Sequence, residues 1–211
     1  MYNKYVKRPL DVILSLCAIL ILLPLLLLTS ILVRLKLGTP VIFKQKRPGL
    51  NGKIFTLYKF RTMTEKRDVN GELLPDSERL TKFGRMLRST SIDELPELFN
   101  IFKGDMSMIG PRPLAVQYLE YYNENERRRH NVRPGLSGLA QINGRNALGW
   151  EEKFKYDIIY VDNISLKMDI KIICISIKKV FQRSDIGERG VDSPIDFDEY
   201  RRNQQKKERI I

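Results

Sequence analysis

The sequence predicts an α+β fold that is mainly helical, with a small β-hairpin and a proline-kinked membrane helix at the amino terminus. A long uncharged apolar stretch opens the chain, two β-branched and aromatic stretches flank a group of turn residues, and apolar residues repeat with a helical period elsewhere. At 211 residues the chain can bury one substantial core. We expect a membrane helix with basic flanks at 1–36, a globular domain at 37–185 and a polar, disordered tail at 186–211.

The apolar stretch at 12–33 has no charged residue and is long enough to cross a hydrocarbon layer of about 30 Å. It is too long for a cleavable signal peptide and lacks a small-residue cleavage site. Pro24 lies at its middle, where the missing N–H bends a helix. Basic residues flank both ends, so the charge asymmetry typical of a spanning helix is weak. We favour a re-entrant helix that enters and leaves by the cytoplasmic face. A spanning helix and the buried helix of a soluble protein are the alternatives.

The charge balance indicates an anionic partner. The chain has 37 Lys and Arg against 25 Asp and Glu, a formal net charge of +12. Such a balance suits nucleic acid, an anionic membrane leaflet or phosphorylated substrates. The single histidine excludes any site that needs two, and the two cysteines form no metal-ligand or disulfide pattern. A reducing compartment fits this cysteine usage.

Two strands are predicted at 41–45 and 54–63, joined by dense turn residues at 48–52. Alternation places Lys59 and Arg61 on one face of the second strand. Charges on a hairpin are commonly just solvated, so this pairing alone does not identify a site.

Three further segments have helical periodicity: 78–87, 114–129 and 166–183. The last is amphipathic, with lysines away from its apolar stripe. It can be an interfacial membrane helix or a domain helix with one solvated face.

The segment 88–104 places two adjacent acids at the start of another predicted helix. Ser91 with Glu94 forms a capping-box pattern, but that start would put Pro96 where the helix needs a backbone donor. With Asp93 as N-cap, Pro96 falls in the first turn, so we favour Asp93 at or near the cap. A carboxylate there stays ionised beside the positive end of the helix dipole. The simplest interpretation is that Asp93 only caps the helix.

Two arginines lie close to these acids in the sequence. Arg88 precedes them and suits a phosphate or a salt bridge equally well. Arg112 stands between Pro111 and Pro113, which fix the backbone and reduce the freedom that a phosphate clamp would lose on binding. A rigid turn with an incidental arginine is the alternative.

A glycine-rich loop is predicted at 133–146. Its glycines permit close approach of the backbone to a ligand, and its side chains Gln141, Asn143 and Arg145 can recognise a base or sugar edge. The loop matches neither a Walker sequence nor a dinucleotide-binding sequence.

Taken together, these segments resemble the bacterial sugar transferase family, the small monotopic phosphoglycosyl transferases that begin glycan assembly on a polyprenyl phosphate. The resemblance covers residues 3–185 and keeps one order of motifs. The motifs that carry it are Lys7-Arg8-Pro9-Leu10-Asp11, Phe43-Lys-Gln-Lys-Arg47-Pro-Gly49, Tyr58-Lys59-Phe60-Arg61-Thr62-Met63, Ser91-Ile-Asp93-Glu94-Leu-Pro96-Glu-Leu-Phe-Asn100, Gly104-Asp-Met-Ser-Met-Ile-Gly-Pro-Arg112-Pro113 and Arg133-Pro-Gly-Leu-Ser-Gly-Leu-Ala-Gln141-Ile-Asn-Gly-Arg145.

The resemblance implies a reaction. The family moves a sugar-1-phosphate from a UDP-sugar to undecaprenyl phosphate and releases UMP, with Mg²⁺ as cofactor. Asp93 corresponds to the nucleophile that forms a phosphosugar-enzyme intermediate, and Glu94 to its partner acid. The family's membrane segment is a re-entrant helix, often broken at Ser-Pro, whereas this chain has Leu23-Pro24 and lacks that hydroxyl.

This mechanism is consistent with the residue types. Asp93 and Glu94 can supply oxygen ligands to Mg²⁺, and the candidate cations for the phosphates are Lys59, Arg88, Arg112 and Arg145. The resemblance implies a cytosolic catalytic domain at the cytoplasmic face of the bacterial inner membrane, with membrane lipid and downstream glycosyltransferases as further partners and no nucleic acid.

Two other functions fit parts of the sequence. A membrane-anchored glycosyltransferase would release UDP instead of UMP, and a basic membrane- or nucleic-acid-binding module would explain the charge without using the two acids. The sequence contains no motif that selects the donor sugar or the glycan pathway.

Overall fold

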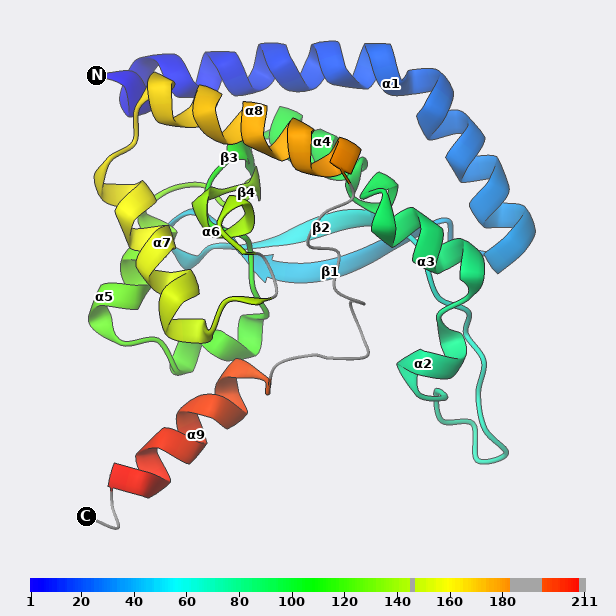
Figure 1. Cartoon of the computed structure of the whole chain (residues 1–211). Helices are drawn as coiled ribbons and strands as arrows, with labels where there is room; N and C mark the ends of the chain where they lie inside the picture. Colours follow the sequence, from blue (N-terminus) through cyan, green and yellow to red (C-terminus); the bar gives the residue numbers. More distant parts are fainter. Residues whose placement is uncertain (145–146, 183–194, 209–211) are drawn as a thin grey trace.

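The structure, a computed structural model, describes residues 1–144, 147–182 and 195–208 (Figure 1). Its α-helices are α1 (Lys7–Leu37), α2 (Asp76–Arg79), α3 (Lys82–Ser89), α4 (Glu97–Lys103), α5 (Glu124–Arg127), α6 (Leu139–Ile142), α7 (Trp150–Asp162), α8 (Leu166–Gln182) and α9 (Phe197–Glu208). Its strands are β1 (Ile42–Pro48), β2 (Ile54–Phe60), β3 (Ser107–Ile109) and β4 (Gly135–Ser137). A π-helix η1 (Tyr2–Val6) precedes α1, and the 3₁₀ helices are η2 (Leu50–Gly52), η3 (Ile92–Glu94), η4 (Val116–Glu120) and η5 (Arg128–Asn131). The predicted fold class, mainly helical α+β, is confirmed.

The long helix α1 bends partway along its length (Figure 1). Residues up to Leu22 pack on a cluster that includes Leu98 and Ile101, whereas Leu26 and later residues pack on a different cluster around Phe60. The change of partner occurs at Pro24, which lies inside the helix. In the described chain, the one helix long and apolar enough to cross a membrane runs from η1 through α1, and only 17% of its most apolar window is buried. That exposure disfavours the buried helix of a soluble protein.

Polar residues at the start of α1 fix it to the domain. Arg8 donates through Nη1 to the carbonyl of Ile101 at 2.6 Å, close to the end of α4. Asp11 accepts hydrogen bonds from Ser107 Oγ at 3.1 Å and from the Met108 amide at 2.9 Å. The basic and acidic residues that precede the apolar stretch are therefore docking contacts as well as membrane flanks.

The predicted hairpin is confirmed: β1 and β2 pair antiparallel, with Ile42 opposite Phe60. Helix α4 is tied to β2 through Asn100, whose amide donates to the carbonyl of Thr56 at 2.7 Å and accepts from the Tyr58 amide at 3.0 Å. The second sheet, a parallel pair of β3 and β4, was not predicted. Each of its strands has only three residues, which is too short for a periodic signal.

Two of the predicted helices are interrupted. The helix expected at 78–87 breaks because Leu80 is extended and Thr81 caps a new helix, α3, by accepting from the Gly84 amide. The helix expected at 114–129 is wrong as a single element. It divides into η4, α5 and η5, because Asn123 and Glu126 form a capping box that starts a helix in its middle. The amphipathic helix near 166–183 is confirmed as α8.

The expectation of a disordered tail is wrong for residues 197–208, which form α9. Phe197 at its start is fully buried. A single apolar residue in a charged segment carries too little periodicity to predict a docked helix.

Candidate active site

The acid pair lies in the 3₁₀ turn η3, just before α4. Neither predicted helix start is correct: Ser91 precedes η3 with a positive φ of 56° and no side-chain cap bond, and Pro96 is the N-cap of α4. Pro96 has no N–H to donate to the carbonyl of Ile92, and the Leu95 amide donates to that carbonyl instead. Proline thus sets the tighter turn that carries Asp93.

Asp93 and Glu94 are both buried, at 4% and 6% exposed. Glu94 Oε1 forms ion pairs with two cations, Lys59 Nζ at 2.8 Å and Arg112 Nη2 at 2.5 Å. Lys59 also contacts Glu97 Oε1 at 3.1 Å. Asp93, Glu94, Glu97, Lys59 and Arg112 are called the active-site cluster below.

Electrostatics within the active-site cluster follow from burial and pairing. Burial raises the pKa of Glu97 to about 7, and the Lys59 ammonium opposes this rise. The Glu94 carboxylate raises the pKa of Arg112 above its ordinary value. The cluster therefore keeps Arg112 charged beside Glu94.

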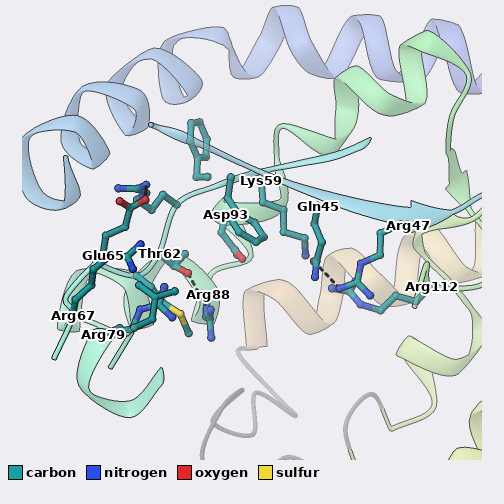
Figure 2. A pocket seen from close by; sticks show the side chains of 15 residues that line it. Gln45, Arg47, Lys59, Thr62, Glu65, Arg67, Arg79, Arg88, Asp93 and Arg112 are labelled. Atoms are coloured by element: carbon teal, nitrogen blue, oxygen red, sulfur yellow. Dashed lines mark hydrogen bonds and ion pairs between the residues drawn. The ribbon is translucent and has the colours of Figure 1, made fainter. Parts of the chain in front are cut away.

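Asp93 faces a cavity of about 460 Å³ whose described lining is strongly cationic (Figure 2). Two acids, Glu65 and Asp93, line it. The cations that line it are Arg47, Lys59, Arg61, Arg67, Arg79, Arg88 and Arg112. Such an excess of positive charge around one buried carboxylate suits a polyanionic ligand such as a diphosphate.

The two adjacent acids could also hold a divalent cation. In the described residues no group of three or more metal-ligating side chains is present. Mg²⁺ is commonly bound through one or two carboxylates together with substrate phosphates. Asp93, which lines the cationic cavity, and its neighbour Glu94 fit that pattern.

Most of the predicted site residues meet at this cavity. Lys59, Arg88, Asp93 and Arg112 line it, and Glu94 joins them through its ion pairs. Arg88 is oriented by its Nε donating to Thr62 Oγ1 at 3.0 Å. The predicted face that Lys59 shares with Arg61 is confirmed, because both side chains line the cavity.

The predicted ligand-binding loop lies elsewhere. Gln141 and Asn143 donate to backbone carbonyls of their own segment, Leu136 at 3.4 Å and Leu139 at 2.7 Å, and neither lines the cavity of Asp93. Arg145 falls outside the described residues.

The loop glycines serve packing between two backbone segments. A Cβ on Gly135 would lie 2.0 Å from the amide nitrogen of Gly110, and one on Gly138 would lie 2.2 Å from the carbonyl oxygen of Gly110. We expected a ligand to approach these glycines closely. In the structure the backbone at Gly110, in the turn that precedes Arg112, occupies that space instead.

Several lining residues were not predicted as site residues. Arg47 occurs in the motif that precedes the hairpin turn, and Arg79 lies within the helix expected at 78–87. Glu97 follows Pro96 in the sequence with nothing to mark it as buried, although it is only 1% exposed. Arg47 belongs to a run of cations at 44–47, which is a visible signal, whereas only the tertiary fold reveals the burial of Glu97.

A second, mostly apolar groove of about 630 Å³ lies between α1, the hairpin and α4. Leu23, Leu26 and Leu27 of α1 line it, together with Lys44 and Lys103. Phe60 lines both this groove and the cavity of Asp93. The two spaces therefore share Phe60 as a lining residue.

Comparison with known proteins identifies the family. A family model described as bacterial sugar transferase matches residues 2–183. An uncharacterized sugar transferase, EpsL of Bacillus subtilis, is 61% identical over 154 residues, which cover 73% of this chain and 76% of that protein.

Two relatives have a stated reaction. A UDP-glucose:undecaprenyl-phosphate glucose-1-phosphate transferase of Klebsiella pneumoniae is 40% identical over 85% of this chain and 41% of its own length. An N-acetylgalactosamine phosphotransferase that uses UDP-N-acetylgalactosamine and undecaprenyl phosphate, from Aeromonas hydrophila, is 36% identical over 83% and 44%. The chain spans less than half the length of these two relatives. From the model match and these identities, the chain belongs to the bacterial sugar transferase family.

Proposed function

We propose that this protein transfers a sugar-1-phosphate from a UDP-sugar to undecaprenyl phosphate and releases UMP, which starts the assembly of a glycan. The observation that carries the proposal is the buried Asp93 carboxylate facing a cavity lined by arginines and a lysine. Relatives whose names state transfer of a sugar phosphate to undecaprenyl phosphate support the general reaction. Those relatives use different sugars, so the donor sugar is left open.

The proposed first step is attack by an Asp93 carboxylate oxygen on the phosphorus that bears the sugar. The phosphoanhydride bond breaks, and UMP leaves with the bonding electrons. Asp93 then carries a phosphosugar. Phosphoryl transfer asks the protein for positioning and charge neutralisation, which Lys59, Arg88 and Arg112 are placed to supply.

In the second step, a phosphate oxygen of undecaprenyl phosphate attacks the same phosphorus. The bond to Asp93 breaks, the carboxylate is regenerated, and the sugar leaves as a polyprenyl diphosphate. Mg²⁺, held by Asp93 and Glu94 together with substrate phosphates, would neutralise charge that develops on the diphosphate. Lys59 and Arg112 keep the Glu94 carboxylate oriented at the cavity.

The acceptor arrives from the membrane in this proposal. Helix α1 is re-entrant, and both ends lie on the cytoplasmic side of the inner membrane. The apolar groove beside Phe60 suits an isoprenoid chain, because it opens next to α1 and adjoins the cavity of Asp93. Downstream glycosyltransferases would take up the product.

The decisive experiment is intact-protein mass spectrometry of the purified protein incubated with Mg²⁺ and a panel of UDP-sugars, without acceptor. We expect one phosphosugar adduct with the cognate donor and none in Asp93→Asn. Adding undecaprenyl phosphate should discharge the adduct. An adduct that persists in Asp93→Asn would refute the nucleophile.

The nucleotide product separates the proposal from a glycosyltransferase on a membrane anchor. That enzyme would release UDP, and the proposed reaction releases UMP. Tags at both termini test the membrane arrangement: protease protection of only one tag in inverted vesicles would mean that α1 spans the bilayer.

A further inference from the structure

The helix α9 begins beyond the residues that the family model matches, which end at 183. It docks on the catalytic domain through Phe197, whose side chain is fully buried. The rings that surround Phe197 form an aromatic socket made of Tyr118, Tyr122, Trp150 and Phe154. Their ring centroids lie 4.9 to 5.5 Å from that of Phe197, which is the range of favourable aromatic pairs.

Polar contacts hold the same helix in place. Trp150 Nε1 donates to the carbonyl of Ile195 at 2.9 Å, and the Tyr118 hydroxyl donates to Asp196 Oδ1 at 2.9 Å. Arg201 pairs with the buried Glu126 at 2.5 Å. These contacts fix one register of α9 on the aromatic socket.

A continuous set of contacts leads from the socket to the active site. The ring of Tyr122 stacks on Phe197, and its hydroxyl accepts from Arg129 Nη1 at 3.2 Å. Arg129 Nη2 donates to the main-chain carbonyl of Arg112 at 2.8 Å. Arg112 in turn reaches Glu94 at 2.5 Å.

Arg129 is the rigid part of this path. Its side chain is 2% exposed and makes two bonds to Asp157, through Nε at 3.0 Å and Nη2 at 2.7 Å. Its guanidinium also lies over the rings of Tyr122 and Phe154, 5.6 Å from each centroid. Arg129 thus contacts both the rings of the socket and the main-chain carbonyl of Arg112.

We propose that Phe197 is a positioning residue for Arg112: docking of α9 in the aromatic socket orders Arg112 for the donor's phosphates, and the bound nucleotide stabilises docking in return. The inference rests on the proposed function in taking Arg112 as a phosphate ligand. Reciprocity between the two events is required by linkage.

Trp150 is the only tryptophan in the chain and lies against Phe197, so its fluorescence reports docking without reference to activity. The test uses the full chain in lipid nanodiscs, with UMP as the probe ligand. The variant is Phe197→Ala, and the matched control is Asn203→Ala on the exposed side of α9.

We expect Phe197→Ala to shift Trp150 emission to the red and to weaken UMP binding about tenfold. The KM for the UDP-sugar should rise with little change in kcat, because the reacting carboxylate is not altered. UMP should change Trp150 emission in the wild type and in Asn203→Ala, but not in Arg112→Ala. A helix with a purely structural role would leave this ligand-dependent signal at zero in all four proteins.

If Phe197→Ala undocks α9, as seen by the red shift of Trp150, but has the same UMP affinity and KM as Asn203→Ala, the inference is overturned and the proposed function is left intact. Failure of the wild type to bind UMP would overturn both. If Phe197→Ala does not fold, Tyr122→Phe retains the ring and removes only the hydroxyl that Arg129 contacts. It should keep the Trp150 emission and weaken UMP binding about threefold; unchanged UMP affinity in this variant would also refute the path.

Discussion

Two groups of side chains in this protein each pair a buried carboxylate with a basic side chain but differ in what surrounds them. The active-site cluster joins Glu94 to Lys59 and Arg112. The second group, here called the anchor cluster, consists of Lys7, Tyr2, Tyr160 and Asp169. Asp169 accepts from Lys7 at 2.6 Å, from Tyr2 at 2.6 Å and from Tyr160 at 2.7 Å.

The anchor cluster is internally satisfied: one carboxylate has one ammonium, and two hydroxyls use its remaining acceptor capacity. It joins α1 to α8. The active-site cluster instead borders a cavity whose lining holds more cations than acids. Burial and ion pairing are therefore common to a structural contact and a candidate site, and the cavity with its cation-rich lining is what distinguishes the site.

The largest difference is expected for catalysis. Asp93→Asn should lower turnover at least about a thousandfold, because the amide cannot act as the nucleophile, while the melting temperature stays near that of the wild type. Asp169→Asn should lower the melting temperature and leave the turnover of the folded protein near that of the wild type. Both are measured by UMP release and by thermal unfolding in detergent. Equal losses of turnover in the two variants would erase the distinction between the clusters.

The next effect concerns the stability of the anchor cluster. Lys7→Met leaves the Asp169 carboxylate buried without its cation, which should cost about 3–5 kcal/mol of unfolding free energy. Lys4→Met, at an exposed position of the same basic flank, is the control and should change little. UMP affinity measured on the folded variant should remain that of the wild type. A melting temperature equal to that of the control would show that the buried pair contributes nothing net.

The comparison also explains what could be predicted from the sequence. The hairpin was predictable, since alternation and turn residues are local signals, and so was the shared face of Lys59 and Arg61. The role of Lys7 was predicted only as a membrane flank. Its partner Asp169 lies in α8, and no local pattern connects the two.

Three of the misses have the same origin. The pairing of β3 with β4, the burial of Glu97 and the docking of Phe197 all depend on contacts between segments distant in the sequence. The exact start of α4 was missed for a local reason, the effect of Pro96 on the preceding turn. Motif order was enough to recognise the family. The cavity beside the acids could not be predicted, because its lining comes from segments that are distant in the sequence.

A smaller effect should distinguish charge from geometry at the active-site cluster. Arg112→Lys retains a positive charge but loses the planar fork that can donate to a carboxylate and a phosphate together. We expect UMP affinity to fall about tenfold, measured by titration calorimetry in nanodiscs. Arg128→Lys is the matched control, because Arg128 forms a more exposed ion pair with Asp162. Equal UMP affinities in the two variants would mean that any cation suffices at position 112.

The smallest effect concerns His130, a half-buried base beside the cation Arg129. Burial lowers the pKa of His130 to about 4, and the charges of Arg129 and Arg127 act in the same direction, opposed by a hydrogen bond with the backbone of Gly49. Between pH 6.5 and 4 the unfolded chain therefore binds more protons at this residue than the folded chain. Its contribution to stability is complete above pH 6.5 and is lost as the pH falls toward 4.

The melting temperature of the wild type should accordingly fall relative to that of His130→Gln as the pH is lowered through this window. The chain has one histidine, so its ring signals in NMR titration report the same pKa without overlap. A midpoint near pH 6.5 would contradict the prediction. It would mean that His130 is solvated in the folded chain and that the charge of Arg129 is screened from it.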